Sequence, residues 1–198
     1  MGLYGGLLLA WDLSVSDFKY FTTGASLMVE GKNLGLDFPV RIMNVYGPYS
    51  HKQVFWERIR DGSLLNHQSL IWGGDLNLSL SDVDVWGAGR INYTLHDLFN
   101  SSFERDGLID IKPNILVLTL STGRYGSEGI AKRLDRFLMT EFVCNSLGRF
   151  RYWWVYTGIY DHKVVVLELD SEKSHSFYPS KFNKVWLKDD SFCRVVEG

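Results

Sequence analysis

The sequence lacks the features that define several classes of protein. Its two cysteines, Cys144 and Cys193, are too few and too far apart for a disulfide framework or a cysteine-rich zinc site, which indicates a reducing, intracellular setting. The apolar run Leu7–Trp11 is far shorter than a membrane span of about 20 residues, and no basic segment precedes it. We therefore expect neither a membrane span nor a signal peptide, and interpret this run as a buried strand.

The sequence also lacks a large net charge and a glycine-rich motif for nucleotide binding. The formal net charge of −2 gives no overall basic field, so binding of nucleic acid would need a local basic patch. Basic residues cluster in "GIAKRLDRF" and "LGRFRYW". No G-x-G-x-x-G stands between a strand and a helix, which argues against a Rossmann domain.

The composition is that of a folded domain. The 198 residues are 45% hydrophobic and 15% aromatic, far from the composition of disordered chains, and no repeat or low-complexity tract occurs. The length fits a single domain. We expect this domain over residues 1–170, followed by a linker and a possible helix over residues 171–198.

Two predicted helices interrupt a series of predicted strands. One helix follows Ser50, which forms a possible capping box with Gln53, and the other runs from a plausible N-cap at Thr94 to a stop at Gly107. A short helical turn is possible over 140–148. Strands are expected over 69–77, 115–121, 131–139, 149–158 and 163–170, and a hairpin over 25–47.

This order predicts an α/β layered domain with packed sheets and helices outside. Mainly antiparallel pairing is expected, because several strands are joined by short turns rather than by helical crossovers. Polar residues fall at or near the ends of these strands, where layered scaffolds commonly collect functional groups. They are Tyr46, Asp75 with Asn77, Thr119, Asp135, and Asp161 with His162.

Each of these residues, taken alone, has an ordinary structural interpretation. Asp75 and Asn77 are typical of a strand cap or an Asx-turn, and Tyr46 and Thr119 of common strand residues. Asp135, between two arginines, could form a surface ion pair of little value. His162 is the best single candidate, because an imidazole beside a carboxylate can exchange a proton near neutral pH.

The order of the motifs adds a resemblance to a known family. "NVYGP", "GGDLN", "LTLS", "KRLDRFL" and "YDH" before "KVVVLEL" resemble motifs of the endonuclease/exonuclease/phosphatase superfamily. The match is closer to the endonuclease region of plant LINE-type (non-LTR) retrotransposon polyproteins, through "GGLLLAWD", "GGDLNLSLSDVDVWGAGR", "GRYGSEGIAKRLDRFL" and "PSKFNKVWLKDDSF". The resemblance covers essentially the whole chain.

The resemblance implies a four-layer αββα sandwich with two mainly antiparallel sheets, and Mg²⁺-dependent cleavage of phosphoester bonds in DNA. It implies that Asp75 orients or deprotonates the attacking water and that Asn77 helps to hold that water and the phosphate. His162 would contact the phosphate, with Asp135 as its carboxylate partner. Asp161 would lie near the metal, and Tyr46 and Thr119 would support or contact the phosphate.

The chain also departs from the family pattern. An N-terminal strand-helix portion that carries an Asn motif and the principal Mg²⁺-binding Glu has no counterpart here, Tyr160 replaces a usual Ser, and Leu120 replaces an aromatic residue. Loss of the main carboxylate should weaken Mg²⁺ binding, and loss of a central strand should leave one sheet with an uncovered edge or face.

Two functional interpretations remain open. The first is an Mg²⁺-dependent endonuclease domain, impaired as it stands, that acts on chromosomal DNA in the nucleus beside the reverse transcriptase region of a polyprotein. The second is a catalytically inactive remnant that binds nucleic acid or protein weakly. A phosphatase or phosphodiesterase acting on a small molecule is a distant third.

Overall fold

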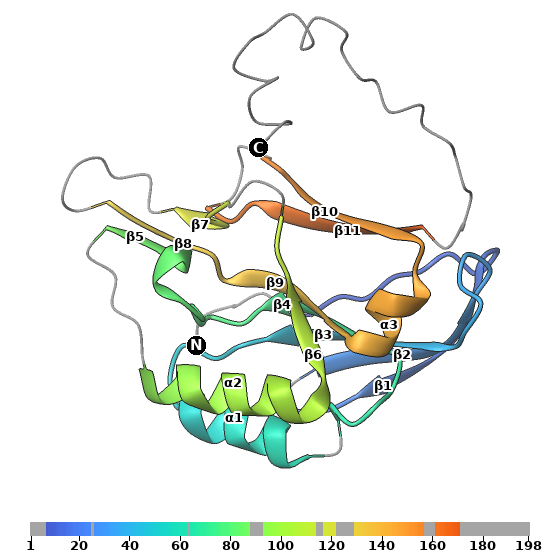
Figure 1. Ribbon diagram of the computed structural model, residues 1–198, viewed down its shortest axis with the longest axis horizontal. Helices are drawn as coiled ribbons and strands as arrows, with labels where there is room; N and C mark the ends of the chain where they lie inside the picture. Colours follow the sequence, from blue (N-terminus) through green and yellow to red (C-terminus); the bar gives the residue numbers. More distant parts are fainter. Residues whose placement is uncertain are drawn as a thin grey trace, which may run out of the picture.

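A six-stranded mixed sheet forms the centre of the protein (Figure 1). The computed structural model describes residues 7–24, 26–62, 64–87, 93–113, 117–121, 129–156 and 161–170. The strand order is β1-β2-β3-β4-β9-β6, and neighbours are antiparallel except for the parallel pair β3 and β4, which helix α1 connects. The strands of this sheet are β1 (Ser16–Thr22), β2 (Ser26–Asn33), β3 (Val40–Tyr46), β4 (Leu70–Asp75), β6 (Leu108–Ile111) and β9 (Asp135–Thr140).

Two helices cover one face of this sheet. They are α1 (Lys52–Asp61) and α2 (Tyr93–Asp106), which lie side by side beneath the sheet in Figure 1. Trp56 of α1 and Phe99 of α2 pack edge to face with ring centroids 4.8 Å apart, and both rings contact Trp72 of β4. Burial of these large apolar surfaces gives the layer its main favourable free energy.

The other face of the sheet packs against a two-stranded antiparallel sheet. This second sheet consists of β10 (Arg149–Val155) and β11 (Val164–Asp170), and α3 (Glu141–Ser146) lies at the end of the interface. Tyr152 of β10 and Val143 of α3 are buried against Met139 of β9 in this second core. Trp153, on the other face of β10, is 45% exposed. The loss of a central strand and the uncovered edge or face expected from it stay predictions.

A three-stranded sheet stands at one edge of the molecule and leads to the candidate site. It has the order β5-β8-β7, with β5 (Val85–Gly87) after a short 3-10 turn (Asp82–Asp84), β7 (Leu120–Ser121) and β8 (Ile130–Lys132). A further antiparallel bridge joins Leu120 to His162, just before β11. The prediction of a mixed α/β sandwich with mainly antiparallel sheets is confirmed. The predicted linker and possible helix over 171–198 lie outside the described residues.

Three local predictions at the starts of elements are wrong. Leu7–Trp11 forms no strand, because none of the described strands pairs with it, and Leu8 is 84% exposed. The capping box at Ser50 does not form: α1 begins after His51, which adopts a left-handed conformation (φ 55°), and the Gln53 amide donates to Glu57. Helix α2 begins at Tyr93, so Thr94 lies inside the helix rather than at its cap.

Two predicted strands are shorter than the sequence pattern indicates. Of the strand expected over 115–121, only β7 forms among the described residues. The strand expected over 131–139 is divided into β8 and β9, because the chain turns at Arg133 and Leu134 to place the Arg133 guanidinium in the interior. This division moves Asp135 to the first position of β9.

Candidate active site

The register of the central sheet brings three of the candidate residues into one row. Asp75 ends β4; it is paired with Tyr46 at the end of parallel β3 and with Asp135 at the start of antiparallel β9. The preceding glycines let these strands approach, since a Cβ on Gly74 (φ +137°) would lie 1.9 Å from the carbonyl oxygen of Val45. Strand pairing thus gathers residues that lie 60 positions apart in the sequence, from 75 to 135.

The segment after β4 forms a tight turn around the Asp75 carboxylate. The backbone N–H of Asn77 donates to Asp75 Oδ1 at 2.8 Å, the pattern of an Asx-turn. Asn77 adopts a left-handed conformation (φ 50°), and its side-chain amide donates to the carbonyl of Gly47 at 2.6 Å. The interpretation of Asp75 and Asn77 as an Asx-turn is therefore correct. This turn uses Asp75 Oδ1 and does not involve Asp75 Oδ2.

Asp75 Oδ2 faces a histidine and aspartate pair. It lies 3.9 Å from His162 Nε2, and the other imidazole nitrogen, Nδ1, lies 2.8 Å from Asp135 Oδ2. The side chains of Asp75, Asp135 and His162 are 10%, 16% and 27% exposed, so solvent reaches the imidazole most readily. Asp135 thereby favours the tautomer with the proton on Nδ1 and orients Nε2 toward Asp75.

The electrostatics of the three groups favour proton transfer. The hydrogen bond to Asp135 raises the pKa of His162, against the effect of burial, and the negative charges of Asp135 and Asp75 raise it further. Burial raises the pKa of Asp75, the N–H of Asn77 opposes this, and the charge of Asp135 adds to it. With a raised pKa, Asp75 accepts a proton more readily than an exposed carboxylate does, and His162 keeps a proton to donate at higher pH.

Thr119 supports this pair through the backbone. Its side chain is buried, and its hydroxyl accepts hydrogen bonds from the N–H groups of Leu134 (3.0 Å) and Asp135 (3.1 Å). Its carbonyl accepts from the N–H of Lys163 at 2.8 Å. Thr119 therefore ties the segment of His162 to the segment of Asp135, a positioning contact that the sequence pattern did not indicate.

Tyr46 and Asp161 lie at the exposed margin of the site. Tyr46 is 40% exposed, and its hydroxyl donates to the Tyr49 hydroxyl at 3.2 Å. This hydrogen bond, followed by burial and the charges of Tyr46, Asp75 and Asp161, raises the pKa of Tyr49 to about 12. Asp161 is exposed, and its charge also acts on His162.

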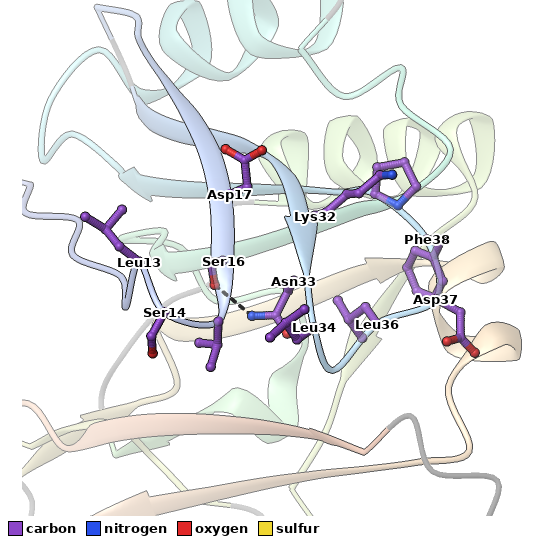
Figure 2. A pocket seen from close by; sticks show the side chains of 12 residues that line it. Leu13, Ser14, Ser16, Asp17, Lys32, Asn33, Leu34, Leu36, Asp37 and Phe38 are labelled. Carbon is purple, nitrogen blue, oxygen red and sulfur yellow. Dashed lines mark hydrogen bonds between the residues drawn. The ribbon is translucent and has the colours of Figure 1, made fainter.

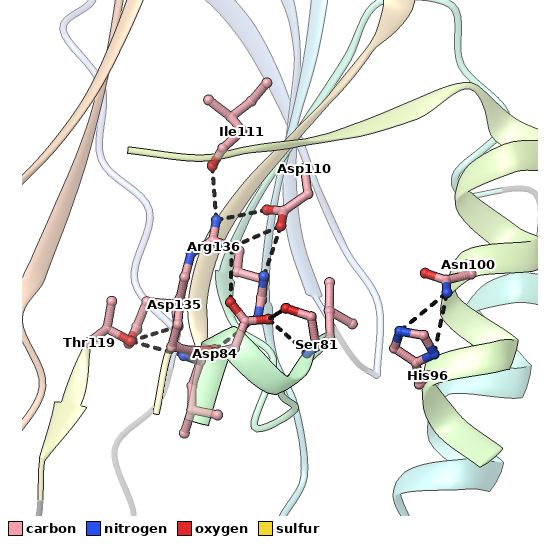
Figure 3. A network of polar contacts seen from close by, with 12 residues as sticks. Ser81, Asp84, His96, Asn100, Asp110, Ile111, Thr119, Asp135 and Arg136 are labelled. Carbon is pink, nitrogen blue, oxygen red and sulfur yellow. Dashed lines mark hydrogen bonds and ion pairs between the residues drawn. The ribbon is translucent and has the colours of Figure 1, made fainter. Parts of the chain in front are cut away.

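A buried network of charges behind the site was missed by sequence reasoning. The guanidinium groups of Arg133 and Arg136 are fully buried; both bind Asp110, and Arg136 NH2 binds Asp84 Oδ2 at 2.7 Å (Figure 3). Asp135, which stands between the two arginines in the sequence, pairs with neither and turns instead to His162. The predicted surface ion pair at Asp135 is therefore wrong, because both arginines point into the interior.

The donor set of the site is suited to a divalent cation. Ligand atoms of Asp75, Asp135 and His162 all lie within 4.8 Å of one another. Two carboxylates with an imidazole nitrogen are a common donor set for divalent cations, whereas Mg²⁺ prefers oxygen ligands and water. This group could therefore bind a metal when the imidazole is neutral.

A separate pocket lies away from this site. Its volume is about 540 Å³, and it is formed at the ends of β1 and β2, where Asn33 donates to the Ser16 hydroxyl at 2.8 Å (Figure 2). Strand β1 is at the edge of the central sheet, three strands from β4.

Among the described residues, no helix is long and apolar enough to cross a membrane.

The sheet order and the two cores form an α/β sandwich, and this fold is shared by solved structures of endonucleases, including the following three. The endonuclease domain of TRAS1, a telomere-specific non-LTR retrotransposon, has 19% identity and a TM-score of 0.60 over 80% of this chain and 70% of that chain.

The other two structures are AP endonucleases. LMAP from Leishmania major has 19% identity and a TM-score of 0.56 over 74% of this chain and 55% of that chain. The enzyme from Archaeoglobus fulgidus has 19% identity and a TM-score of 0.55, over 72% of this chain and 65% of that chain. The chain thus spans less than two thirds of the length of either AP endonuclease. No protein-family model matches the sequence, and neither does any curated protein.

Proposed function

We propose that this chain is a DNA-cleaving endonuclease domain of retrotransposon origin, with a weakly held divalent cation. The observation that carries the proposal is the arrangement of Asp75, Asp135 and His162, in which a carboxylate faces an imidazole oriented by a second carboxylate. The fold supports it, since the solved structures that share the fold bear the names of DNA endonucleases.

The three side chains divide the chemistry among them. Asp75 Oδ2 accepts a proton from a water molecule as that water attacks the phosphorus. The bond from phosphorus to the leaving oxygen breaks, and the leaving oxygen keeps the electron pair and takes a proton from solvent. His162 donates a hydrogen bond from Nε2 to a phosphate oxygen and stabilises the charge that develops there. Asp135 holds the imidazole by its Nδ1 and stabilises the imidazolium form.

A divalent cation, when bound, would neutralise charge on the phosphate. Asp161, at the exposed margin, is the residue that would hold it, and Mg²⁺ is the cation that the resemblance implies. Asp75 and Asp135 are already engaged with Asn77 and His162. Because few free carboxylate oxygens remain among the described residues of the site, we expect low affinity for Mg²⁺ and slow cleavage.

The same engagement of the carboxylates favours a second candidate, a catalytically inactive remnant that binds nucleic acid without cutting it. Nicking of supercoiled plasmid at increasing Mg²⁺ concentration distinguishes the two. Cleavage that is lost in Asp75→Asn and His162→Asn supports the endonuclease. Binding of DNA with no nicking at any Mg²⁺ concentration supports the remnant.

The setting of this activity is part of the proposal. A domain of the plant LINE type would act on chromosomal DNA in the nucleus, next to the reverse transcriptase region of a longer polyprotein. The resemblance of "GGDLNLSLSDVDVWGAGR" and "GRYGSEGIAKRLDRFL" to that subgroup supports this setting. Co-purification of the chain with a reverse transcriptase region from the same transcript tests it.

A further inference from the structure

Lys52 carries a half-buried positive charge beside the Asp75 turn. It is the first residue of α1, and its Nζ donates a hydrogen bond to the backbone carbonyl of Asn77. Within the described ranges, it forms no ion pair with a carboxylate. Burial lowers the pKa of Lys52, and the charge of Lys132 lowers it further, while Asp75 opposes the shift. The ammonium group of Lys52 has three N–H donors, and the carbonyl of Asn77 occupies one of them, so the group can also bind an anion.

Lys132 belongs to a segment that contacts the same turn. It is the last residue of β8, opposite Leu120, and two residues later the carbonyl of Leu134 accepts a hydrogen bond from the N–H of Leu76 at 3.0 Å. Leu76 stands between Asp75 and Asn77, so the chain that follows Lys132 lies directly against the turn. Lys132 is half-buried, and no hydrogen bond or ion pair of its side chain is found in the part of the chain that the structure describes.

Two cations therefore belong to segments that contact the turn that carries Asp75. Their charges repel each other: the charge of Lys132 lowers the pKa of Lys52, and the charge of Asp75 opposes this effect. An anion held by both would remove this repulsion. The position is next to the carboxylate that we assign to the attacking water.

We propose that Lys52 and Lys132 form a second phosphate subsite, which holds the phosphate of the substrate strand adjacent to the one that is cleaved. The inference rests on the proposed function for the identity of the anion, a phosphodiester of DNA. The subsite supplies a local basic patch in a chain with a net charge of −2. It would fix the register of the strand, because a second phosphate contact orients the scissile bond toward Asp75 and His162.

A purely structural role for Lys52, as a support for the Asn77 carbonyl, predicts different behaviour. A structural residue changes stability and leaves the salt dependence of DNA binding unchanged. A phosphate contact releases counterions, so its loss lowers the slope of log K against log salt concentration by about 1. Substitution of Lys132 distinguishes the structural role from the phosphate contact more clearly, because no hydrogen bond or ion pair of its side chain is found in the described residues.

The test measures binding of a fluorescein-labelled 20-base-pair duplex by anisotropy, in EDTA, between 50 and 200 mM NaCl. The proteins are the full 198-residue chain, Lys52→Gln, Lys132→Gln, Lys132→Arg and the control Lys19→Gln. Lys19 is an exposed residue of edge strand β1, three strands from β4. Thermal unfolding of each variant confirms that the protein is folded.

We expect Lys52→Gln and Lys132→Gln each to lower the salt slope by about 1 and to weaken binding at 100 mM NaCl by up to about fivefold. Lys132→Arg and Lys19→Gln should match the wild type. Slopes of both Gln variants equal to that of Lys19→Gln, or no binding by the wild type, would overturn the inference. Because EDTA removes divalent cations from the assay, a subsite that binds DNA in a chain that never nicks would contradict only the proposed endonuclease activity.

Discussion

Replacement of Arg136 by methionine tests the buried charge network behind the site. The Arg136 guanidinium is fully buried and donates to Asp84 Oδ2 (2.7 Å), Asp110 Oδ2 (2.9 Å) and the carbonyl of Arg133 (3.0 Å). Burial raises the pKa of Asp84, but the charge and hydrogen bond of Arg136 lower it more, so the carboxylate stays ionised. Arg136→Met keeps much of the side-chain volume and leaves that carboxylate in the interior without its closest partner.

The expected cost follows from this loss of a partner. Removal of one member of a buried ion pair typically costs about 3–5 kcal/mol, because the remaining charge is uncompensated. With a urea m-value of about 2 kcal/mol/M, this corresponds to a decrease of about 2 M in the midpoint. Tryptophan fluorescence in urea measures it.

The matched control is Arg60→Met. Arg60 pairs with Asp61 at 2.7 Å on the surface, where the side chains are 32% and 64% exposed, so the expected loss is below about 1 kcal/mol. A loss for Arg136→Met no larger than that of Arg60→Met would refute the reasoning. It would mean that Arg133 alone, or penetrating water, compensates Asp84.

Three further changes test separate contacts. Protonated His162 stabilises the fold because its pKa is raised in the folded state. This contribution is complete below the pKa of histidine in the unfolded chain and is lost as the pH rises through the pKa in the folded state. The urea midpoint should therefore fall between pH 6 and pH 8, and it should fall less in His162→Asn. Gly74→Ala places a Cβ 1.9 Å from the Val45 carbonyl oxygen at φ +137° and should cost over about 2 kcal/mol, whereas Gly107→Ala, at φ +60° with nothing within 4 Å, should cost about 1 kcal/mol; equal costs by urea unfolding would contradict the strand contact. Thr119→Val removes the acceptor for two backbone N–H groups and should cost about 1–3 kcal/mol, with Thr119→Ser close to the wild type; a Val variant as stable as the Ser variant would show that water replaces the hydroxyl.

The sequence predicted the row of polar residues because it depends on strand ends. Buried strands stop at recognisable turn residues, so Tyr46 and Asp75 could be placed at the ends of β3 and β4 from the apolar pattern alone. The structure brings Tyr46, Asp75, Asp135 and His162 together, and their chemical roles stay predictions. The Asn77 amide, which we expected at the phosphate, is directed to the Gly47 carbonyl instead.

The elements that could not be predicted depend on contacts distant in the sequence. Arginines in a predicted strand, such as Arg133 and Arg136, are expected at the surface. Their burial is explained only by their contacts with Asp84 and Asp110, which lie more than 20 residues away in the sequence. The importance of Lys52 likewise depends on the carbonyl of Asn77, 25 residues along the chain. Local periodicity contains no information about such partners, because they are set by the packing of β8 and β9 against the rest of the sheet.

The start of the chain illustrates a different cause. Leu7–Trp11 has the composition of a buried strand, yet a strand forms only where a neighbour supplies its hydrogen bonds. The described residues supply that neighbour to β1, which pairs with β2 along its whole length, and not to Leu7–Trp11. Composition therefore identified an apolar segment correctly and its conformation wrongly.

Nicking of supercoiled plasmid by the 198-residue chain, measured over increasing Mg²⁺ concentration, tests the central claim most directly. The account predicts slow nicking that keeps rising into the millimolar range, because few carboxylate oxygens of the described site remain free for the cation. It also predicts that Asp75→Asn and His162→Asn, folded by thermal unfolding, abolish the nicking, while Lys19→Gln leaves it unchanged. Equal nicking by the wild type and the two site variants, or no nicking at any Mg²⁺ concentration, would contradict the account.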